Sequence, residues 1–327
     1  MKLSALEQIP LFEGRTPQEG IEQTVRLAQG VEELGFERFW VAEHHNTSAF
    51  LSSAPDLLMM HVLDATTSIR VGSGGVMAMH YGSLQMAERF ATLATLHPDR
   101  VDMGLGRAPG GDMLASHALN QNRVIDPDSI NTLIAETKAL MLDELPADHP
   151  YASLEVHPTP AVLPQFWLLG SSGQSAAWAA QHDMSYAYAQ FFSGRQSVDV
   201  MDHYRSHLPE GATSGRTLSA LCVSAAATRE EAWEQALVAG AFRLGLRTGR
   251  SGGFRSPSTF TPEFRAQVEQ YLTLDPSVII GTYDEVADAV GSFATNHRTD
   301  EVMLISYIDD VEVKINQYRE LAARLGD

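Results

Sequence analysis

Short apolar runs alternate with amphipathic segments along most of the chain. The most informative run is Phe39–His45, with the sequence FWVAEHH, in which four apolar residues lead into an acid and two histidines. A run that is apolar on both faces and stops abruptly at polar groups is typical of a strand buried in a parallel sheet. The same pattern predicts seven more strands, at residues 2–6, 69–72, 100–105, 166–169, 185–189, 218–225 and 302–308.

Helical segments separate these strands, and several open with capping signals. Residues 16–19, 228–231 and 282–285 each carry a threonine followed three residues later by a glutamate, which is the capping-box pattern. Other helices are predicted at 53–67, 83–96, 128–142 and 311–325, and one more begins within 171–175. Strands that alternate with helices require right-handed crossovers and a parallel sheet.

Eight such units predict a single α/β domain, residues 1–327, folded as a (β/α)8 TIM barrel. Two segments depart from the repeat. Proline-rich residues 146–164 are predicted to form an irregular insertion before the fifth strand. Residues 248–262 follow the seventh strand and its helix, are rich in Gly, Ser, Arg and Pro, and have little to bury. We therefore expect this second segment to be a mobile flap.

Charge and composition narrow the possible partners. The formal charge is −18, which argues against nucleic acid and against an anionic membrane surface. The single cysteine, Cys222, lies in an apolar run, so we expect neither a disulfide nor a thiolate metal site. No apolar stretch approaches the length of a membrane span, and the N-terminus lacks the pattern of a signal peptide. A cytoplasmic protein is the simplest prediction.

Glu43, His44 and His45 stand where the second strand ends, and chemistry is placed at this end of the strands in such barrels. Successive strand residues point to opposite faces, so the two histidines should diverge rather than bind one metal. The chain also lacks an HExxH motif, so metal-dependent hydrolysis is a weak alternative and no metal site is predicted. Taken alone, His44 is either a catalytic group or a structural hydrogen-bonding residue.

Glycines follow the third and fourth strands. Gly72-Ser73-Gly74-Gly75 admits backbone conformations that other residues avoid, which suits either close approach of a flat ligand or a tight turn. Residues 104–110 nearly match a dinucleotide GxGxxG motif, with Asp126 about 20 residues further on. The match is poor, because Pro109 and paired glycines stand where a helix should already be under way.

Arg107 leaves the fourth strand and suits an anionic oxygen ligand, with surface ion pairing as the alternative. Ser171, Ser172 and Ser175 place hydroxyls and free backbone N–H groups where the next helix begins, which suits either an anion site or plain N-capping. A serine hydrolase is not indicated, because GSSGQ does not match GxSxG. Arg107 and these serines would be neighbours in a barrel and together could clamp one phosphate.

These motifs resemble those of the bacterial luciferase-like monooxygenases, a family of flavin-dependent (β/α)8 enzymes, over nearly the whole chain. FWVAEHH resembles the second-strand signature of that family, and VGSGGVM its flavin-lining third-strand turn. VDMGLGRAPGG and WLLGSSGQSAAWAAQ resemble its phosphate-binding segments, and GTYDEVADAV its C-terminal segment. The order and spacing of the motifs make the resemblance specific.

The resemblance implies reduced FMN, or less often a deazaflavin, bound across the open end of the barrel. By motif position, His44 resembles the histidine that assists the reaction of reduced flavin with oxygen. The Gly74-Gly75 bond falls where the family commonly has a non-proline cis peptide. The cofactor-binding residues implied in this way are Gly74, Gly75, Val76, Met77, Arg107, Ser171, Ser172, Ser175 and Gln190.

Two positions depart from luciferase itself. Gly106 stands where its catalytic subunit has a reactive cysteine, and Gln190 where it has a tryptophan, which argues against light emission. The resemblance also implies a homodimer through the second and third helices, with Met59, Met60 and Met86 compatible with that contact.

The resulting hypothesis is a monooxygenase that takes reduced FMN from a separate NAD(P)H:flavin reductase and uses O2 to oxygenate a small organic substrate. In this hypothesis His44 is an acid/base or hydrogen-bond partner, the 248–262 flap excludes water, and Phe191 and Phe192 are candidate substrate walls. A deazaflavin-dependent dehydrogenase and a non-catalytic flavin-binding protein are the alternatives.

Overall fold

The computed structural model describes residues 1–121, 126–193, 198–212, 215–249 and 252–326. Eight parallel strands form a closed barrel, which confirms the predicted (β/α)8 fold. The last strand of the chain, β10, pairs with both β1 and β8 and so closes the ring. In sheet order the strands are β10 (Glu301–Ile305), β1 (Lys2–Glu7), β2 (Arg38–Val41), β3 (Arg70–Ser73), β5 (Val101–Gly106), β6 (Gln165–Gly170), β7 (Ser185–Ala189) and β8 (Thr217–Ala226).

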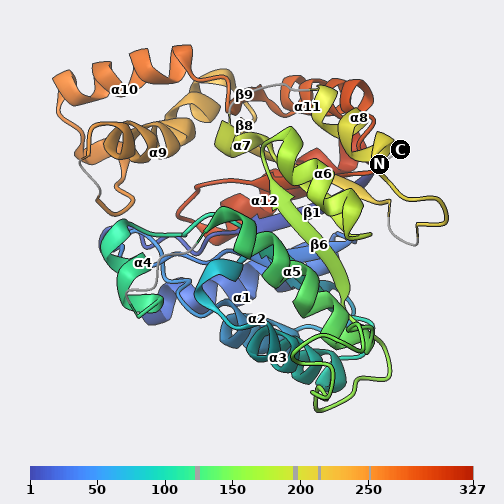
Figure 1. Ribbon diagram of the computed structural model, residues 1–327. Coiled ribbons are helices and arrows are strands. Elements are labelled where there is room, and N and C mark those ends of the chain that lie inside the picture. Colours follow the sequence, from blue (N-terminus) through green and yellow to red (C-terminus); the bar gives the residue numbers. More distant parts are fainter. Residues whose placement is uncertain (122–125, 194–197, 213–214, 250–251, 327) are drawn as a thin grey trace.

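Helices surround the barrel, and the pair α9 and α10 lies to one side of it (Figure 1). Their bounds are α1 (Pro17–Glu33), α2 (Pro55–Ala65), α3 (Ser83–Leu96), α4 (Met113–Leu119), α5 (Pro127–Leu142), α6 (Gly173–Gln181), α7 (Gln190–Ser193), α8 (Val198–Ser206), α9 (Arg229–Arg247), α10 (Pro262–Leu274), α11 (Tyr283–His297) and α12 (Val311–Leu325). Short 3-10 turns lie at η1 (Ala78–His80) and η2 (Pro257–Thr259).

Two of the predicted capping boxes are complete. Thr16 Oγ1 accepts from the backbone N–H of Glu19 at 3.2 Å, and the Glu19 carboxylate accepts from Thr16 N at 2.7 Å. Thr282 and Glu285 make the same reciprocal pair at the start of α11. Each pair satisfies backbone donors that an isolated helix leaves free. The residue patterns therefore locate these helix starts correctly.

The structure adds elements that the sequence did not predict. Strand β9 (Val278–Thr282) pairs with the second half of β8, because β8 continues beyond the residues that pair with β7 and β10. Strand β4 (Val76–Met77) pairs with the end of β5. Helix α4 occupies part of the expected loop after β5, and Asp112 caps it by accepting from Ala115 N at 2.8 Å. A helix of one to two turns is too short to show a hydrophobic period.

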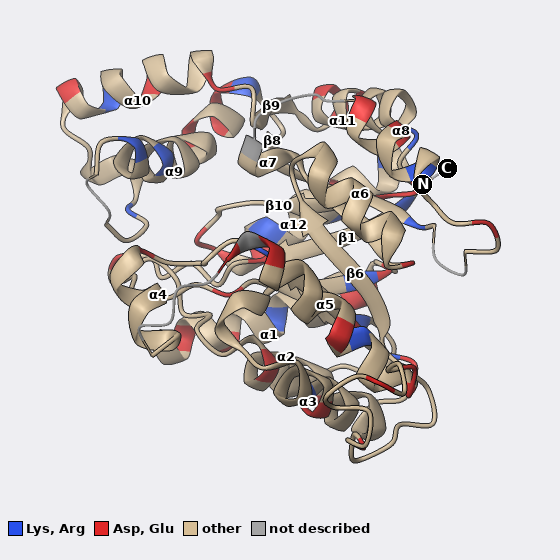
Figure 2. Cartoon of the chain, viewed as in Figure 1, with Lys and Arg blue, Asp and Glu red and all other residues tan. Residues whose placement is uncertain are grey.

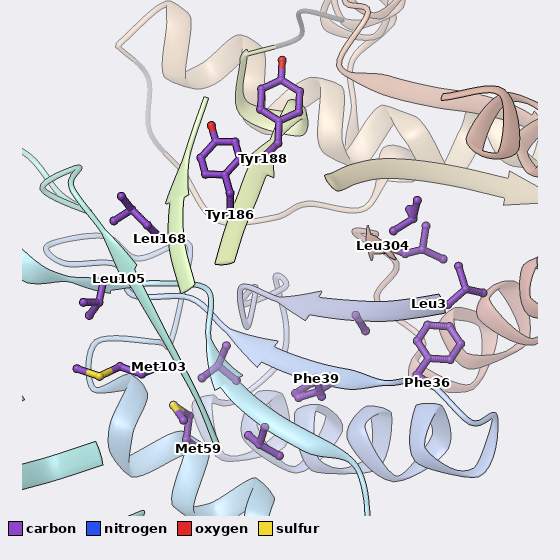
Figure 3. Packing of buried hydrophobic residues seen from close by; sticks show 14 of the residues in the cluster. Leu3, Phe36, Phe39, Met59, Met103, Leu105, Leu168, Tyr186, Tyr188 and Leu304 are labelled. Carbon is purple, nitrogen blue, oxygen red and sulfur yellow. The ribbon is translucent and has the colours of Figure 1, made fainter. Parts of the chain in front are cut away.

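The main hydrophobic core lies between the barrel and its helices (Figure 3). Met59 and Met86 are buried in it, so the expectation that they are compatible with a subunit contact is wrong for these two methionines. Both lie on the inward faces of their helices. The outward faces present Leu57, which is 69% exposed, and Leu96, which is 55% exposed.

A network of charged side chains fills the barrel at the amino ends of its strands. Arg38 contacts Asp102 through Nη1 at 2.6 Å and Glu301 through Nε at 2.7 Å. Arg70 Nε lies 2.8 Å from Asp102, and Trp40 Nε1 donates to the same carboxylate at 2.9 Å. Because each of these charges has close partners of opposite sign, the network can stay buried.

Acidic and basic positions are interspersed over the helices in the view of Figure 2. No helix within the described ranges is long and apolar enough to cross a membrane.

Candidate functional site

The carboxyl ends of the barrel strands meet at one face, which we call the mouth. Polar or small residues stand at almost every strand end there, as expected for a barrel in which all strands are parallel. In strand order they are Gln8, His44, Gly74 and Gly75, Arg107, Ser171 and Ser172, Gln190 and Tyr307.

His44 lies among neutral partners. Its Nδ1 is 3.2 Å from Ser52 Oγ, and its Nε2 is 3.4 Å from the side-chain nitrogen of Gln8. The imidazole stacks on Phe50 with ring centroids 4.1 Å apart. Burial, followed by repulsion from His45, lowers the pKa of His44 to about 4. The ring is therefore neutral across the physiological range.

Glu43 and His45 point to the other side of the strand end, so the predicted divergence of the two histidines is confirmed. The buried Glu43 carboxylate accepts from Tyr81 OH at 2.9 Å and from Met77 N at 2.8 Å, and lies 2.6 Å from His45 Nε2. The bond from Met77 N holds the end of the 74–77 turn against the end of β2. His45 is thus a structural partner of this acid.

The Gly74-Gly75 peptide bond is cis, as the resemblance implied. Neither glycine has room for a side chain. A Cβ on Gly74 would lie 2.6 Å from Leu6 Cδ1, and a Cβ on Gly75 would lie 2.9 Å from Gly104 O. Val76 is buried behind the turn and Met77 is half-buried. The turn therefore presents bare backbone at the mouth.

Ser73 closes the gap between β3 and β5 just below this turn. The backbones of the two strands pair only as far as Gly72 and Asp102. Beyond that point Ser73 Oγ donates to Gly104 O at 2.7 Å and accepts from Gly104 N at 3.0 Å.

Arg107 lies against the first turns of α6, which confirms the predicted proximity of the arginine to this helix. Its Nη1 is 3.5 Å from Gln174 Oε1, and its guanidinium lies 4.6 Å from the ring centre of Trp178. The buried Nε has no hydrogen-bond partner. Burial lowers the pKa of Arg107, although the group stays charged. A cation with a spare donor thus faces a helix N-terminus.

Ser172 and Ser175 cap α6 as a reciprocal pair. Ser172 Oγ accepts from Ser175 N at 3.4 Å, and Ser175 Oγ accepts from Ser172 N at 3.3 Å while donating to Ser172 O at 2.7 Å. Ser175 is buried and also contacts Tyr186 OH at 3.2 Å, whereas Ser172 is exposed and Ser171 is half-buried. The hydroxyl of Ser175 therefore shapes the helix start, and Ser172 faces outward from it.

Gln190 is buried at the start of α7, and its amide nitrogen lies 3.4 Å from Pro276 O. It thereby ties β7 to the segment before β9. Of the two following phenylalanines, Phe191 is half-buried and packs against the core, and Phe192 is 76% exposed. Only Phe191 is positioned as an inner wall.

An aromatic cluster covers the mouth next to His44. Phe254 is 1% exposed and lies 4.6 Å from Phe242, 5.0 Å from Tyr307 and 5.4 Å from Phe50 between ring centres. Its backbone exchanges hydrogen bonds with the 11–13 segment. The expectation that residues 248–262 have little to bury is therefore wrong at Phe254, because one aromatic side chain anchors the segment. Residues 250–251 lie outside the described part, and mobility stays a prediction.

Three residues at the site were not predicted from the sequence. Gln8, Ser52 and Tyr307 all contact His44 or one another. Gln8 and Tyr307 follow strands, so their position was a usable signal, but their partnership spans 299 residues. Ser52 had no local signal.

Within the described residues, no group of three or more His, Cys, Asp or Glu side chains could hold a metal ion. Cys222 is buried, and burial raises the pKa of its thiol. The chemistry available at the mouth comes from an imidazole, a guanidinium and backbone groups.

The fold and the mouth together define a (β/α)8 barrel with a bare glycine turn, a neutral histidine and an arginine–helix pair. A model of the luciferase-like monooxygenase family matches residues 1–297. YwcH of Bacillus subtilis (strain 168) is 34% identical over 335 residues, covering 100% of both chains. The N-acetyl-S-alkylcysteine monooxygenase of the same organism is 33% identical, covering 98% of this chain and 97% of its own. This chain belongs to the luciferase-like monooxygenase family.

Solved structures give the same fold. Apo-MsnO8 has a TM-score of 0.88 and 30% identity, covering 99% of this chain and 98% of its own. More distant structures include 3,6-diketocamphane monooxygenase in complex with FMN (TM-score 0.70, 15% identity, covering 98% and 96% of the two chains). An F420-dependent secondary alcohol dehydrogenase is equally distant (TM-score 0.73, 16% identity, covering 100% and 99%). These last two likenesses concern the fold alone.

Proposed function

We propose that this protein is a monooxygenase that binds reduced FMN at the mouth and uses O2 to oxygenate a small organic substrate. The observation that carries the proposal is the contact of Arg107 with the start of α6, on the same face as the cis Gly74-Gly75 turn and His44. Bound reduced FMN would supply the electrons for oxygen activation. A separate NAD(P)H:flavin reductase would deliver it.

The phosphate end of the cofactor fits the arginine–helix pair. Arg107 offers a charged, half-buried guanidinium with a free Nε, and α6 offers the positive end of its dipole. The half-buried Ser171 and the exposed Ser172 add two hydroxyl groups at the same turn. Ser175 supports this set through its capping bonds and would bind phosphate directly only by exchanging them.

The ring end of the cofactor fits the glycine turn. Gly74 is half-buried and has no side chain, Gly75 and Val76 are buried directly behind it, and the half-buried Met77 ends the turn. Gln190 borders the mouth from β7. A flat ring can lie against such a surface more closely than against ordinary side chains. His44, neutral and half-buried at the same end of the barrel, would accept or hold a proton during oxygen activation.

Flavin binding in both redox states tests the proposal directly. We expect purified protein to bind FMNH2 more tightly than FMN, and FMN more tightly than riboflavin, which lacks the phosphate. Stopped-flow mixing of the FMNH2-loaded protein with O2 should then show a flavin intermediate that His44→Ala shortens. Failure to bind any flavin in either redox state would refute the proposal.

The same assay separates the alternatives. Preference for a deazaflavin, with hydride transfer and no oxygen uptake, would identify a dehydrogenase. Tight retention of oxidised flavin without turnover would identify a flavin-binding protein. The name of the relative that acts as N-acetyl-S-alkylcysteine monooxygenase makes S-alkylated cysteine derivatives a sensible first substrate panel. We also expect a cytoplasmic homodimer whose contact includes the outward faces of α2 and α3.

A further inference from the structure

Ser52 and Gln8 contact the imidazole of His44, and Tyr307 in turn bonds to Gln8, so three segments far apart in the sequence surround this site. Gln8 comes from the end of β1, Ser52 from the stretch before α2, and Tyr307 from the end of β10. His44 lies 3.2 Å from Ser52 Oγ and 3.4 Å from the Gln8 side-chain nitrogen. Ser52 Oγ in turn lies 3.1 Å from the backbone oxygen of Gln8, so the contacts form a closed circuit.

Ser52 fixes the direction of this circuit. The residue is fully buried, and its hydroxyl has one proton, which it donates to Gln8 O. Towards His44, the Ser52 oxygen can therefore only accept. The proton of the neutral imidazole must then lie on Nδ1, and Nε2 must carry the lone pair.

Gln8 and Tyr307 agree with this assignment. A lone pair on Nε2 of His44 requires a donor, and the side-chain NH2 of Gln8 faces it. The amide oxygen of Gln8 is then turned to Tyr307, whose hydroxyl donates to it. Burial raises the pKa of Tyr307, which keeps this phenol protonated and able to donate.

We propose that Gln8, Ser52 and Tyr307 are positioning residues that hold His44 as the Nδ1–H tautomer, with Nε2 available as a hydrogen-bond or proton acceptor. This inference rests on the proposed function for its catalytic meaning. At 3.4 Å, the contact between Gln8 and Nε2 is the longest of the circuit, so a stronger donor displaces it at little cost. The arrangement makes His44 a base rather than an acid.

The residues that contact the His44 ring are uncharged, so they do not oppose the Nδ1–H tautomer. Phe50 and Ser52 contact it from the segment before α2, and Gln8, which accepts from Tyr307 OH, contacts it from the end of β1. None of these four carries a charge, and His45 is the titratable group that bears on His44. The low pKa of His44, which is about 4, agrees with a ring held neutral by its surroundings.

Nitrogen NMR of the full-length protein labelled with 15N-histidine tests the proposal without any flavin. His44→Gln assigns the resonance. The wild-type ring should show a protonated Nδ1 and an unprotonated Nε2. Gln8→Glu replaces the donor by a carboxylate of nearly the same shape, which should move the proton to Nε2 and raise the pKa of His44 by at least about one unit. Ser52→Ala should remove the preference for Nδ1–H, because the acceptor is gone.

Phe50→Leu is the matched control, since it changes a contact with the same ring but leaves every hydrogen bond in place. It should retain the wild-type tautomer. An Nε2–H tautomer in the wild type, or an unchanged tautomer in both Gln8→Glu and Ser52→Ala, would overturn the proposal.

Activity separates this inference from the proposed function. With FMNH2 and O2, Gln8→Glu should lower the yield of oxygenated product by at least about tenfold while FMN affinity stays unchanged. Loss of flavin binding in the wild type would instead refute the function and leave the NMR result standing.

Discussion

The two ends of the barrel treat buried polar groups in opposite ways. At the amino ends of the strands, Arg38 and Arg70 share Asp102, and Glu301 completes the network. At the mouth, Glu43 is likewise held by close partners, but the half-buried His44 is neutral and the Nε of Arg107 has no hydrogen-bond partner. At the amino ends, every charge of the network has a partner of opposite sign. At the mouth, His44 and Arg107 keep hydrogen-bonding groups that a ligand can use.

The difference has a physical reason. A buried charge without partners costs several kcal/mol, so it is tolerated only where a ligand repays that cost. A mutation in the charged network at the amino ends of the strands should therefore change the free energy of unfolding, and one at the mouth should change ligand binding. Four predictions follow this division, from the largest expected effect to the smallest.

Asp102→Ala should lower the free energy of unfolding by about 3–5 kcal/mol, because it leaves two buried guanidiniums and Trp40 Nε1 without their shared acceptor. Denaturant unfolding followed by circular dichroism measures the change. Asp99→Asn is the control: Asp99 also pairs with Arg70, but its side chain is 80% exposed, so its loss should cost less than about 1 kcal/mol.

Acid should weaken the fold through His44. The folded pKa is about 4, below the ordinary 6.5, so the folded protein binds fewer protons than the unfolded chain between these values. The contribution of His44 is therefore complete above pH 6.5 and is lost as the pH falls toward 4, by about 3 kcal/mol. Unfolding free energies of the wild type and His44→Gln across this range should diverge by that slope, and parallel curves would contradict the assignment.

Arg107→Ala should weaken FMN binding by roughly 10- to 100-fold, as expected for losing charge-assisted hydrogen bonds to a phosphate. The free energy of unfolding should change little, because Arg107 is held mainly by Trp178. Binding is measured by fluorescence quenching, with riboflavin as the ligand that lacks phosphate. Arg319→Ala on the surface of α12 should match the wild type in both respects.

Ser172→Ala and Thr16→Ala compare the same capping motif at the starts of two different helices, α6 and α1. Each should lower the free energy of unfolding by about 1 kcal/mol, since each removes an N-cap acceptor. Only Ser172→Ala should also weaken FMN binding, because α1 begins far from the phosphate site proposed at α6. Equal effects on FMN binding would remove the proposed role of α6.

Local patterns were enough to predict the barrel and much of the mouth. Strand ends are marked by an abrupt change from apolar to polar residues, so His44, Arg107 and Ser172 could be placed on one face before the structure was known. Helix α4 was missed because its seven residues are too few to show a helical period. Strand β9 was missed although its apolar residues, Val278, Ile279 and Ile280, form a run like those of the barrel strands.

Partnerships between distant segments were beyond local patterns. Nothing near Phe254 marks it as buried, since its pocket is built from Phe12, Phe50 and Phe242. The hydrogen bond between Tyr307 and Gln8 likewise depends on closure of the barrel, which brings the last strand beside the first.

Ser73 shows how one side chain can stand in for a missing stretch of sheet. The backbone pairing of β3 with β5 is interrupted where β3 leads into the glycine turn. There the hydroxyl of Ser73 bonds to both the backbone N–H and the backbone oxygen of Gly104, which the missing pairing leaves without strand partners. Removing the hydroxyl of Ser73 would therefore leave the backbone N–H and the backbone oxygen of Gly104 without this partner inside the barrel wall. The glycine turn, against which we propose that a flavin ring lies, therefore depends on the single hydroxyl of Ser73.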